Sequence, residues 1–326
     1  MLEKVCMDIN KIKFIGRYAL IDNYYRFFNG GTGFSFKMKG TGFSITLSCG
    51  ADEGYFYIIV DHDYASKVKK EVTGKPIEFS FNKEGIHFVD IIKVNETVHN
   101  TLTLIDLDIH GEQLDFDYHY FKKVKVYGDS TIAGYGLLAH DGPGSVHNSD
   151  AVRDFCFHAL YELNADMDIF SAAGWGLTFS IYTVPNNVGI IDYIDKCAIY
   201  KSNVWKDESG CDLLIVSVGT NDHSYIQEGL ISREEGVDQF VNKYQELIES
   251  EIRYNKDLKI LIVYGTLLEE ETYYLNEEVY KRLKPIYPNL YIHKFHGDNT
   301  GISHHAYIDQ HDKMSEELKA VIKEIL

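Results

Sequence analysis

The chain has 326 residues, of which 45% are hydrophobic and 25% are charged, so it is long enough for two domains and has the composition of an ordinary globular protein. Its formal net charge of −17 disfavours phosphate backbones and anionic lipids, so we expect no nucleic-acid or membrane partner and a neutral substrate. The five cysteines form no C-x-x-C pair and predict buried thiols in a reducing compartment rather than disulfides or a zinc site; they are Cys6, Cys49, Cys156, Cys197 and Cys211.

Residues 1–10 contain no continuous apolar segment, and no later stretch reaches the ~20 apolar residues of a membrane span. We therefore expect a cytoplasmic protein, or a secreted one if a signal peptide was removed. The 24 Tyr and 18 Phe, against only 5 Pro, predict a β-rich portion and aromatic-lined surfaces.

Residues 11–118 follow a β pattern in which short strand-like runs are separated by turn signals such as Gly30-Gly31, Lys39-Gly40-Thr41-Gly42 and Glu84-Gly85. Regular short strands of this kind are typical of an antiparallel sandwich or jelly roll. The predicted strands are 13–15, 33–38, 43–47, 55–60, 77–81, 87–92 and 101–105.

After residue 120, strand-like runs alternate with helix-like segments, which predicts a parallel sheet with helices on both faces. The strand-like runs are 123–127, 213–218, 258–264 and 290–295, and the helix-like segments lie near 151–163, 188–201, 233–254 and 311–326. The sequence therefore predicts two domains: an all-β sandwich at 1–119 and an α/β domain at 120–326.

Ser130 lies where the strand-like run 123–127 breaks at Gly128-Asp129-Ser130. At the carboxyl end of a strand in an open α/β sheet, a serine lies where such folds bind ligands, and backbone N–H groups after it can face developing negative charge. The alternative is a Ser or Asp helix cap with no chemical role.

Two further turns follow apolar runs. Glycine in Ser171-Ala172-Ala173-Gly174-Trp175-Gly176 allows a backbone N–H to approach a reacting oxygen closely, although an ordinary loop is the alternative. In Gly219-Thr220-Asn221-Asp222, Asn221 can present its amide N–H to an oxyanion and Asp222 can accept bonds from loop N–H groups; here the alternative is an Asx turn.

Two adjacent histidines, His304 and His305, precede the predicted last helix. Histidine is well suited to deprotonating a serine near neutral pH, but with 14 histidines in the chain most must be structural or exposed.

Together, these four blocks resemble those of the SGNH (GDSL-type) hydrolases, a superfamily of serine esterases. Ser130 matches the nucleophile of the first block, Gly174 the glycine of the second, Asn221 the asparagine of the third, and His305 the terminal histidine. The resemblance covers residues 122–326.

A sandwich ahead of such a domain is similar to the arrangement in family two carbohydrate esterases, which join a jelly roll to an SGNH domain. The segments Phe14-Ile15-Gly16-Arg17-Tyr18, Gly85-Ile86-His87-Phe88-Val89 and Lys93-Val94-Asn95-Glu96 resemble strand motifs of that sandwich. Residues 305–314 resemble the family's His-Pro-Asn-Val-Ala-Glu-His-Gln-Lys-Met run, and this register selects His305 over His304.

The chain departs from this pattern around His305, because Ala306 replaces the usual proline, and Ile302 and Ser303 stand where an aspartate is often found. The group that orients His305 would then be a backbone carbonyl, Ser303, or a more distant acid such as Asp298. The resemblance favours a Ser-His dyad supported by a carbonyl.

The resemblance implies that Ser130 attacks an ester carbonyl, that His305 takes its proton, and that the N–H groups of Ser130 and Gly174 and the amide of Asn221 hold the oxyanion. Neither metal nor cofactor is needed. Asp129, Asp222 and Ser303 are expected to support the site, and Trp175 and His304 are candidates for stacking on a sugar ring.

The implied substrate is an acetylated carbohydrate, such as acetylated xylan, glucomannan or their oligosaccharides. The alternatives are a lipid or thioester hydrolase with the same catalytic residues and a sugar-binding protein whose SGNH site is idle. The sequence specifies neither the sugar, nor the hydroxyl, nor the oligomeric state.

Overall fold

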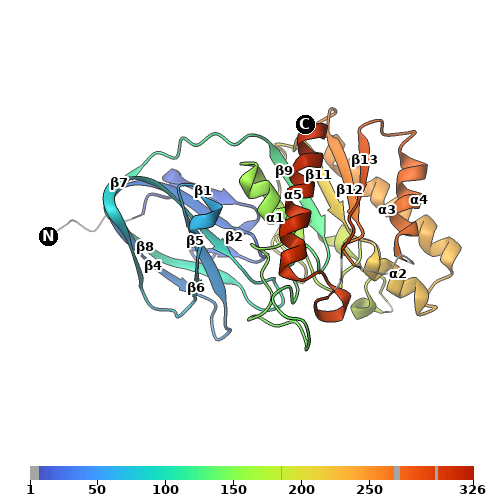
Figure 1. The fold of residues 1–326 in the computed structure, drawn as a ribbon, viewed down its shortest axis with the longest axis horizontal. Helices are drawn as coiled ribbons and strands as arrows, with labels where there is room; N and C mark the ends of the chain where they lie inside the picture. The colour runs from blue at the N-terminus through green and yellow to red at the C-terminus, as the bar shows by residue number, and fades with distance from the viewer. Residues whose placement is uncertain (1–6, 185, 268–271, 298–299) are drawn as a thin grey trace.

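The structure, a computed structural model, describes residues 7–184, 186–267, 272–297 and 300–326. Two sheets lie side by side along the long axis of the molecule, with the N-terminal strands at one end and the helix-flanked sheet at the other (Figure 1). The predicted fold class, an antiparallel sandwich followed by an α/β domain with a parallel sheet, is confirmed.

The N-terminal sheet is antiparallel throughout, in the order β2-β3-β8-β4-β7-β5-β6, with β1 paired to β4. Its side chains alternate toward an interior that contains Phe34, Phe36, Phe43 and Phe56, all fully buried. The strands are β1 (Ile12–Ile15), β2 (Tyr18–Ile21), β3 (Tyr24–Phe27), β4 (Gly33–Ser48), β5 (Tyr55–Val60), β6 (Val68–Glu71), β7 (Ile77–Lys93) and β8 (Leu102–Leu114), with short 3-10 turns at Ile9–Lys11 and Tyr64–Ser66.

Strands β4 and β7 each join two runs that the sequence predicted as separate strands. Gly40 and Gly42, which were read as a turn, are instead points of close backbone approach: Cβ atoms there would lie 2.2 Å from the carbonyl oxygens of His110 and Phe79. The strand continues through Gly40 and Gly42 with a shift of register, as at a β-bulge. Strands β2, β3 and β6 were not predicted.

The C-terminal sheet is parallel in the order β10-β9-β11-β12-β13. Helices α1 and α5 pack on one face, and α3 and α4 on the other (Figure 1). The elements are β9 (Lys123–Gly128), α1 (Phe155–Glu162), β10 (Asp166–Ser171), β11 (Leu213–Ser217), α2 (Thr220–Gln227), α3 (Arg233–Ile252), β12 (Lys259–Tyr264), α4 (Tyr274–Leu283), β13 (Leu290–Lys294) and α5 (Ile308–Ile325).

The helix predicted near 188–201 is wrong, since the segment holds only a 3-10 turn at Ile190–Tyr193. The N–H groups of Ile190 and Ile191 donate to the carbonyls of Gly176 and Leu177 at 3.0 and 3.1 Å, and Cys197 N–H donates to Asn203. The other backbone bonds in the segment are isolated i→i−3 turns, such as that from Lys196 N–H to the carbonyl of Tyr193, so no continuous α-helix forms.

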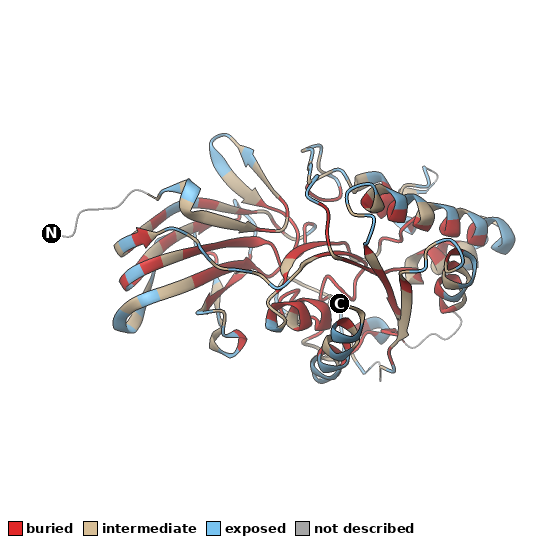
Figure 2. Cartoon of the chain, turned by 90° about the horizontal axis from the view of Figure 1, so that it is seen from above, coloured by how far each residue is buried: buried red, intermediate tan, exposed pale blue. Residues whose placement is uncertain are grey.

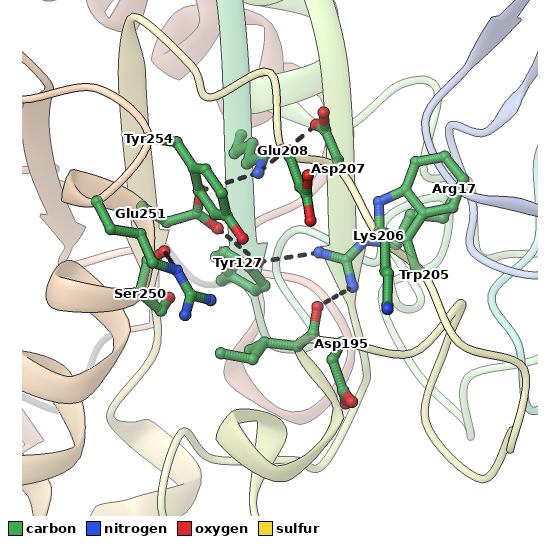
Figure 3. Close-up of a pocket in the computed structure, with 13 residues that line it drawn as sticks. Arg17, Tyr127, Asp195, Trp205, Lys206, Asp207, Glu208, Ser250, Glu251 and Tyr254 are labelled. Atoms are coloured by element: carbon green, nitrogen blue, oxygen red, sulfur yellow. Dashed lines mark hydrogen bonds and ion pairs between the residues drawn. The ribbon is translucent and has the colours of Figure 1, made fainter.

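Arg17 of the sandwich connects the two domains and is 1% exposed. Its guanidinium donates to Asp168 at 3.1 Å, to the Tyr127 hydroxyl at 2.9 Å, and to the carbonyls of Ile194 and Lys196 at 2.9 and 2.8 Å. Figure 3 shows Arg17 pointing toward Tyr127 inside a pocket of about 200 Å³ at the junction. A buried charge needs this complete set of partners, so the junction has one favoured geometry.

Buried residues run through both sheets and across the space between them (Figure 2). Ile15, Tyr57 and Val94 of the sandwich share a core with Phe157 of α1, so the two domains pack directly on each other. The last sandwich strand ends at Leu114 and the first parallel strand begins at Lys123; the boundary between 119 and 120 stays a prediction. Among the described helices, none combines the length and apolar character needed to cross a bilayer.

Candidate active site

Ser130 lies in a tight turn directly after β9 and is 6% exposed. The N–H of Asp129 donates to the carbonyl of Ser217 at the end of β11, at 3.1 Å. The carboxylate of Asp129 accepts bonds from the N–H and hydroxyl of Thr131 at 3.1 and 3.0 Å, and burial raises its pKa to about 6 against these bonds. The turn thus fixes Ser130 at the carboxyl edge of the sheet, where ligands bind in such folds.

His305 faces Ser130 from a loop 175 positions later in the chain, with 2.6 Å between its Nε2 atom and the serine Oγ. Its Nδ1 atom lies 2.8 Å from the carbonyl oxygen of Ile302 and 3.2 Å from that of Ser303. Because carbonyl oxygens only accept hydrogen bonds, Nδ1 carries the proton, and Nε2 of the neutral ring is free to accept the serine proton.

The electrostatics of His305 agree with a base that is neutral in the resting state. Burial lowers its pKa below the ordinary value, and the two carbonyls oppose that shift only in part. A neutral imidazole beside the serine hydroxyl is the form that can take a proton.

Backbone carbonyls occupy the place of the third triad member. Ser303 contributes its carbonyl, while its side chain is exposed on a residue with a φ of 50°. Asp298, the other group considered from sequence, lies outside the described residues.

The predicted oxyanion donors lie around the same cavity as Ser130 and His305. Gly174 has a φ of +78°, a left-handed backbone conformation that favours glycine, and it lies beside the ring of Tyr182 in the cavity lining. Asn221 is the second residue of α2, which follows β11, and its side-chain amide donates to the carbonyl of Trp175 at 3.2 Å.

Asp222 is completely buried and holds the segment that follows the Gly174 turn. Its carboxylate accepts bonds from the N–H groups of Leu177, Thr178 and Phe179 at 2.9, 2.8 and 3.1 Å. Burial raises its pKa to about 7, opposed by these three bonds. Asp222 therefore accepts hydrogen bonds from loop N–H groups, as the sequence predicted.

The cavity has a volume of about 470 Å³, and both domains contribute to its walls. Trp175 reaches it, but is only 1% exposed and packs edge-on against Tyr193 and Tyr200. The residues that line it are Glu96, Val98, His99, Ser130, Tyr135, Ala173, Gly174, Trp175, Tyr182, Tyr200, Asn221, Ser303 and His305.

His304 is exposed and is absent from this lining, so the structure gives no support to its proposed contact with sugar. Sequence reasoning missed Tyr182 and Tyr200, which line the cavity and are 66% and 58% exposed. It also missed Glu96 and His99 as site residues, although the segment 93–96 had been singled out as a family motif. Within the described ranges, no three His, Cys, Asp or Glu side chains are grouped to hold a metal ion.

Comparison with known proteins supports the two-domain fold described above. Residues 14–115 match the family model "Carbohydrate esterase 2 N-terminal". Comparison with curated proteins gives no significant match.

Three solved structures share the fold across both domains. A family two carbohydrate esterase from Clostridium thermocellum, in complex with cellohexaose, is 22% identical, covers 96% of this chain and 98% of its own, and has a TM-score of 0.81. A family two carbohydrate esterase from Cellvibrio japonicus is 19% identical, with coverages of 99% and 97% and a TM-score of 0.82. An acetyl xylan esterase from the rumen bacterium Butyrivibrio proteoclasticus is 17% identical, with coverages of 98% and 96% and a TM-score of 0.80.

The fold of the chain is therefore that of the two-domain family two carbohydrate esterases. The resemblance predicted from the sequence motifs is confirmed, with the family model matching within the sandwich and the solved structures extending the likeness to nearly the whole chain. The family match and the shared fold agree with the prediction of a carboxylic ester hydrolase.

Proposed function

We propose that this protein is a serine esterase that removes O-acetyl groups from carbohydrates through an acyl-enzyme on Ser130. The observation that carries the proposal is the 2.6 Å separation of Ser130 Oγ and His305 Nε2 in a cavity also lined by Gly174 and Asn221. A nucleophile, a base and oxyanion donors around one space are what acyl transfer requires.

In this mechanism, Ser130 Oγ attacks the acetyl carbonyl while His305 Nε2 takes its proton. The oxyanion accepts bonds from the N–H groups of Ser130 and Gly174 and from the Asn221 amide. The imidazolium then protonates the departing sugar oxygen, which leaves as a hydroxyl. The neutral ring next takes a proton from water as it attacks the acyl-enzyme, and returns that proton to Ser130 Oγ as acetate leaves. The carbonyls of Ile302 and Ser303 keep the ring oriented through both steps.

A carbohydrate substrate is supported by one feature of the cavity, by the net charge of the chain and by one comparison. Tyr182 and Tyr200 offer exposed aromatic surfaces at the cavity, and such rings stack on the apolar faces of sugars. The net charge of −17 favours a neutral substrate over an anionic one. The Clostridium thermocellum relative binds cellohexaose.

The test is acetate release from acetylated xylo-, manno- and cello-oligosaccharides, with NMR to locate the hydroxyl that is uncovered. We expect turnover by the wild type and none by Ser130→Ala. Ser171→Ala is a matched control, because Ser171 ends the neighbouring strand β10 and its buried hydroxyl has no hydrogen-bond partner among the described residues.

Acyl-chain preference separates this proposal from the lipid or thioester alternative. We expect 4-nitrophenyl acetate to be hydrolysed with a higher kcat/KM than the octanoate ester, and the reverse order would favour a lipid hydrolase. Binding of the oligosaccharides without acetate release would favour a sugar-binding protein.

A further inference from the structure

Glu96 belongs to the sandwich domain but contacts the oxyanion loop, which we define as residues 172–175. It follows β7 in the chain and is 2% exposed. Its Oε2 atom accepts a hydrogen bond from the N–H of Ala173 at 2.9 Å. Ala173 immediately precedes Gly174, whose own N–H is a proposed oxyanion donor.

The backbone around Glu96 is held by several bonds within the sandwich. Lys93, which is fully buried, donates from its ammonium to the carbonyls of Asn95 and Glu96. The N–H of His99 donates to the Glu96 carbonyl at 3.2 Å, and the Thr97 hydroxyl donates to Asn29 at 3.0 Å. The carboxylate is therefore presented from a fixed backbone.

The negative charge of Glu96 is partly balanced by neighbouring groups. Burial raises its pKa to about 6, while the Ala173 N–H and the Lys93 ammonium act in the opposite direction. Its second oxygen faces His99, with 3.8 Å between Oε1 and Nε2. At neutral pH, Glu96 thus offers an ionised acceptor to Ala173.

Each part of the oxyanion loop has a different anchor. The N–H of Ala172 donates to the carbonyl of Gly128 at 3.1 Å, and the carbonyl of Trp175 accepts from Asn221. Between these two points, the hydrogen bond to Glu96 fixes Ala173. The carbonyl of Ala173 and the N–H of Gly174 belong to the same peptide group. Rotation of that peptide would turn the donor away from the reacting oxygen.

We propose that Glu96 is a positioning residue for esterase catalysis: its carboxylate, supplied by the sandwich domain, holds the oxyanion loop so that the Gly174 N–H faces the substrate carbonyl. This inference rests on the proposed function. It makes the sandwich part of the catalytic machinery rather than only a packing partner.

The test compares three variants of Glu96 with a control variant elsewhere in the sandwich domain. Glu96→Ala removes the acceptor and Glu96→Asp shortens it by one methylene, so both should lower kcat for 4-nitrophenyl acetate by about 10-fold to 100-fold, with KM within about 3-fold. Glu96→Gln keeps an amide oxygen for the Ala173 N–H and should retain at least about a third of wild-type kcat. Glu71→Ala, which removes an exposed carboxylate of strand β6 outside the cavity lining, should keep full activity.

Hydrogen exchange at the Ala173 amide provides a readout that does not depend on turnover. Exchange should accelerate at least about 10-fold in Glu96→Ala and stay unchanged in Glu71→Ala, since only the first variant loses the bond. An unaltered kcat in Glu96→Ala, or equal losses in Glu96→Ala and Glu96→Gln, would overturn the proposal. If the wild type itself hydrolysed no ester, the esterase function would fail, and unchanged exchange in Glu96→Ala would overturn the loop contact separately.

Discussion

The Nε2 atom of His305 lies 2.6 Å from Ser130 Oγ, while the opposite ring nitrogen lies 2.8 Å from the carbonyl oxygen of Ile302. This relationship assigns a direction to the proton: the carbonyl keeps Nδ1 protonated, so the serine proton moves to Nε2. A carboxylate is not required for that orientation. A carboxylate would, however, have stabilised the imidazolium through its negative charge. The two carbonyls stabilise that cation less.

The first prediction concerns the pH dependence of kcat/KM. His305 must be neutral to act as a base, and burial places its pKa below the ordinary value of 6.5. Activity should therefore rise with pH along an acid limb whose midpoint lies below 6.5, and then level off. Initial rates of 4-nitrophenyl acetate hydrolysis, corrected for spontaneous hydrolysis, measure this midpoint. Asp129 and Glu96, each with a pKa raised to about 6, and Asp222, with a pKa raised to about 7, titrate in or near the same range. The limb should persist in Glu96→Gln, and a midpoint above 6.5 in the wild type would contradict the assignment.

A second prediction concerns the Ser303 side chain. Because Ser303 supports His305 through its carbonyl, Ser303→Ala should keep kcat within about 3-fold of wild type. A loss of 100-fold or more would indicate that the hydroxyl has a direct part in orienting the ring.

A third prediction concerns Asn221. Asn221→Ala removes a side-chain donor from the oxyanion site, so kcat should fall about 10²-fold or more with a much smaller change in KM. Ser224→Ala is the control, because Ser224 lies one turn further along α2 and donates to the Thr220 carbonyl. Equal effects of the two substitutions would mean that damage to the helix, rather than loss of a donor, lowers the rate.

A fourth prediction concerns the stability of the loop held by Asp222. Asp222→Ala leaves three buried N–H groups without their acceptor and should lower the free energy of unfolding by about 3 kcal/mol or more. Asp222→Asn keeps one acceptor oxygen, which can still serve Thr178 and Phe179, and should be less destabilising. Urea unfolding followed by fluorescence measures both variants, and equal stabilities of Asp222→Ala and wild type would disprove this role.

A fifth prediction concerns the domain junction. Arg17→Met leaves the carboxylate of Asp168 buried without its main partner, and should lower the free energy of unfolding by about 3–5 kcal/mol. Lys13→Met is the control, since Lys13 also bridges the domains, to Asp166, but that pair is partly exposed. Combining Arg17→Met with Asp168→Leu should recover part of the loss. If Arg17→Met alone were as stable as wild type, the domain junction would not depend on the charge of Arg17.

Local patterns in the sequence predicted the strand ends that carry Ser130 and Asn221, because an apolar strand followed by glycine and polar residues is a short-range signal. The run 167–170, which forms most of β10, was identified as a short apolar run ahead of the Gly174 turn but not counted among the predicted strands, because the charged positions Asp166 and Asp168 interrupt the apolar pattern. The structure gives the reason for those charges, since Lys13 and Arg17 of the sandwich pair with them across the domain junction.

The contribution of the sandwich to the active site could not be predicted in the same way. Glu96 and Ala173 are separated by 77 positions, and their contact depends on how two domains dock rather than on either local sequence. For the same reason the exposed aromatics Tyr182 and Tyr200 gave no sign that they face the cavity. His304 was named as a candidate for sugar stacking because it lies beside His305, but it is exposed and does not line the cavity.

The most direct test of the central claim is covalent labelling with diethyl 4-nitrophenyl phosphate, followed by intact mass measurement and peptide mapping. The account predicts one diethylphosphoryl group per chain, on Ser130, with no labelling of Ser130→Ala and labelling at least about 100-fold slower in His305→Gln. Labelling at another residue, or undiminished ester hydrolysis by Ser130→Ala, would contradict it.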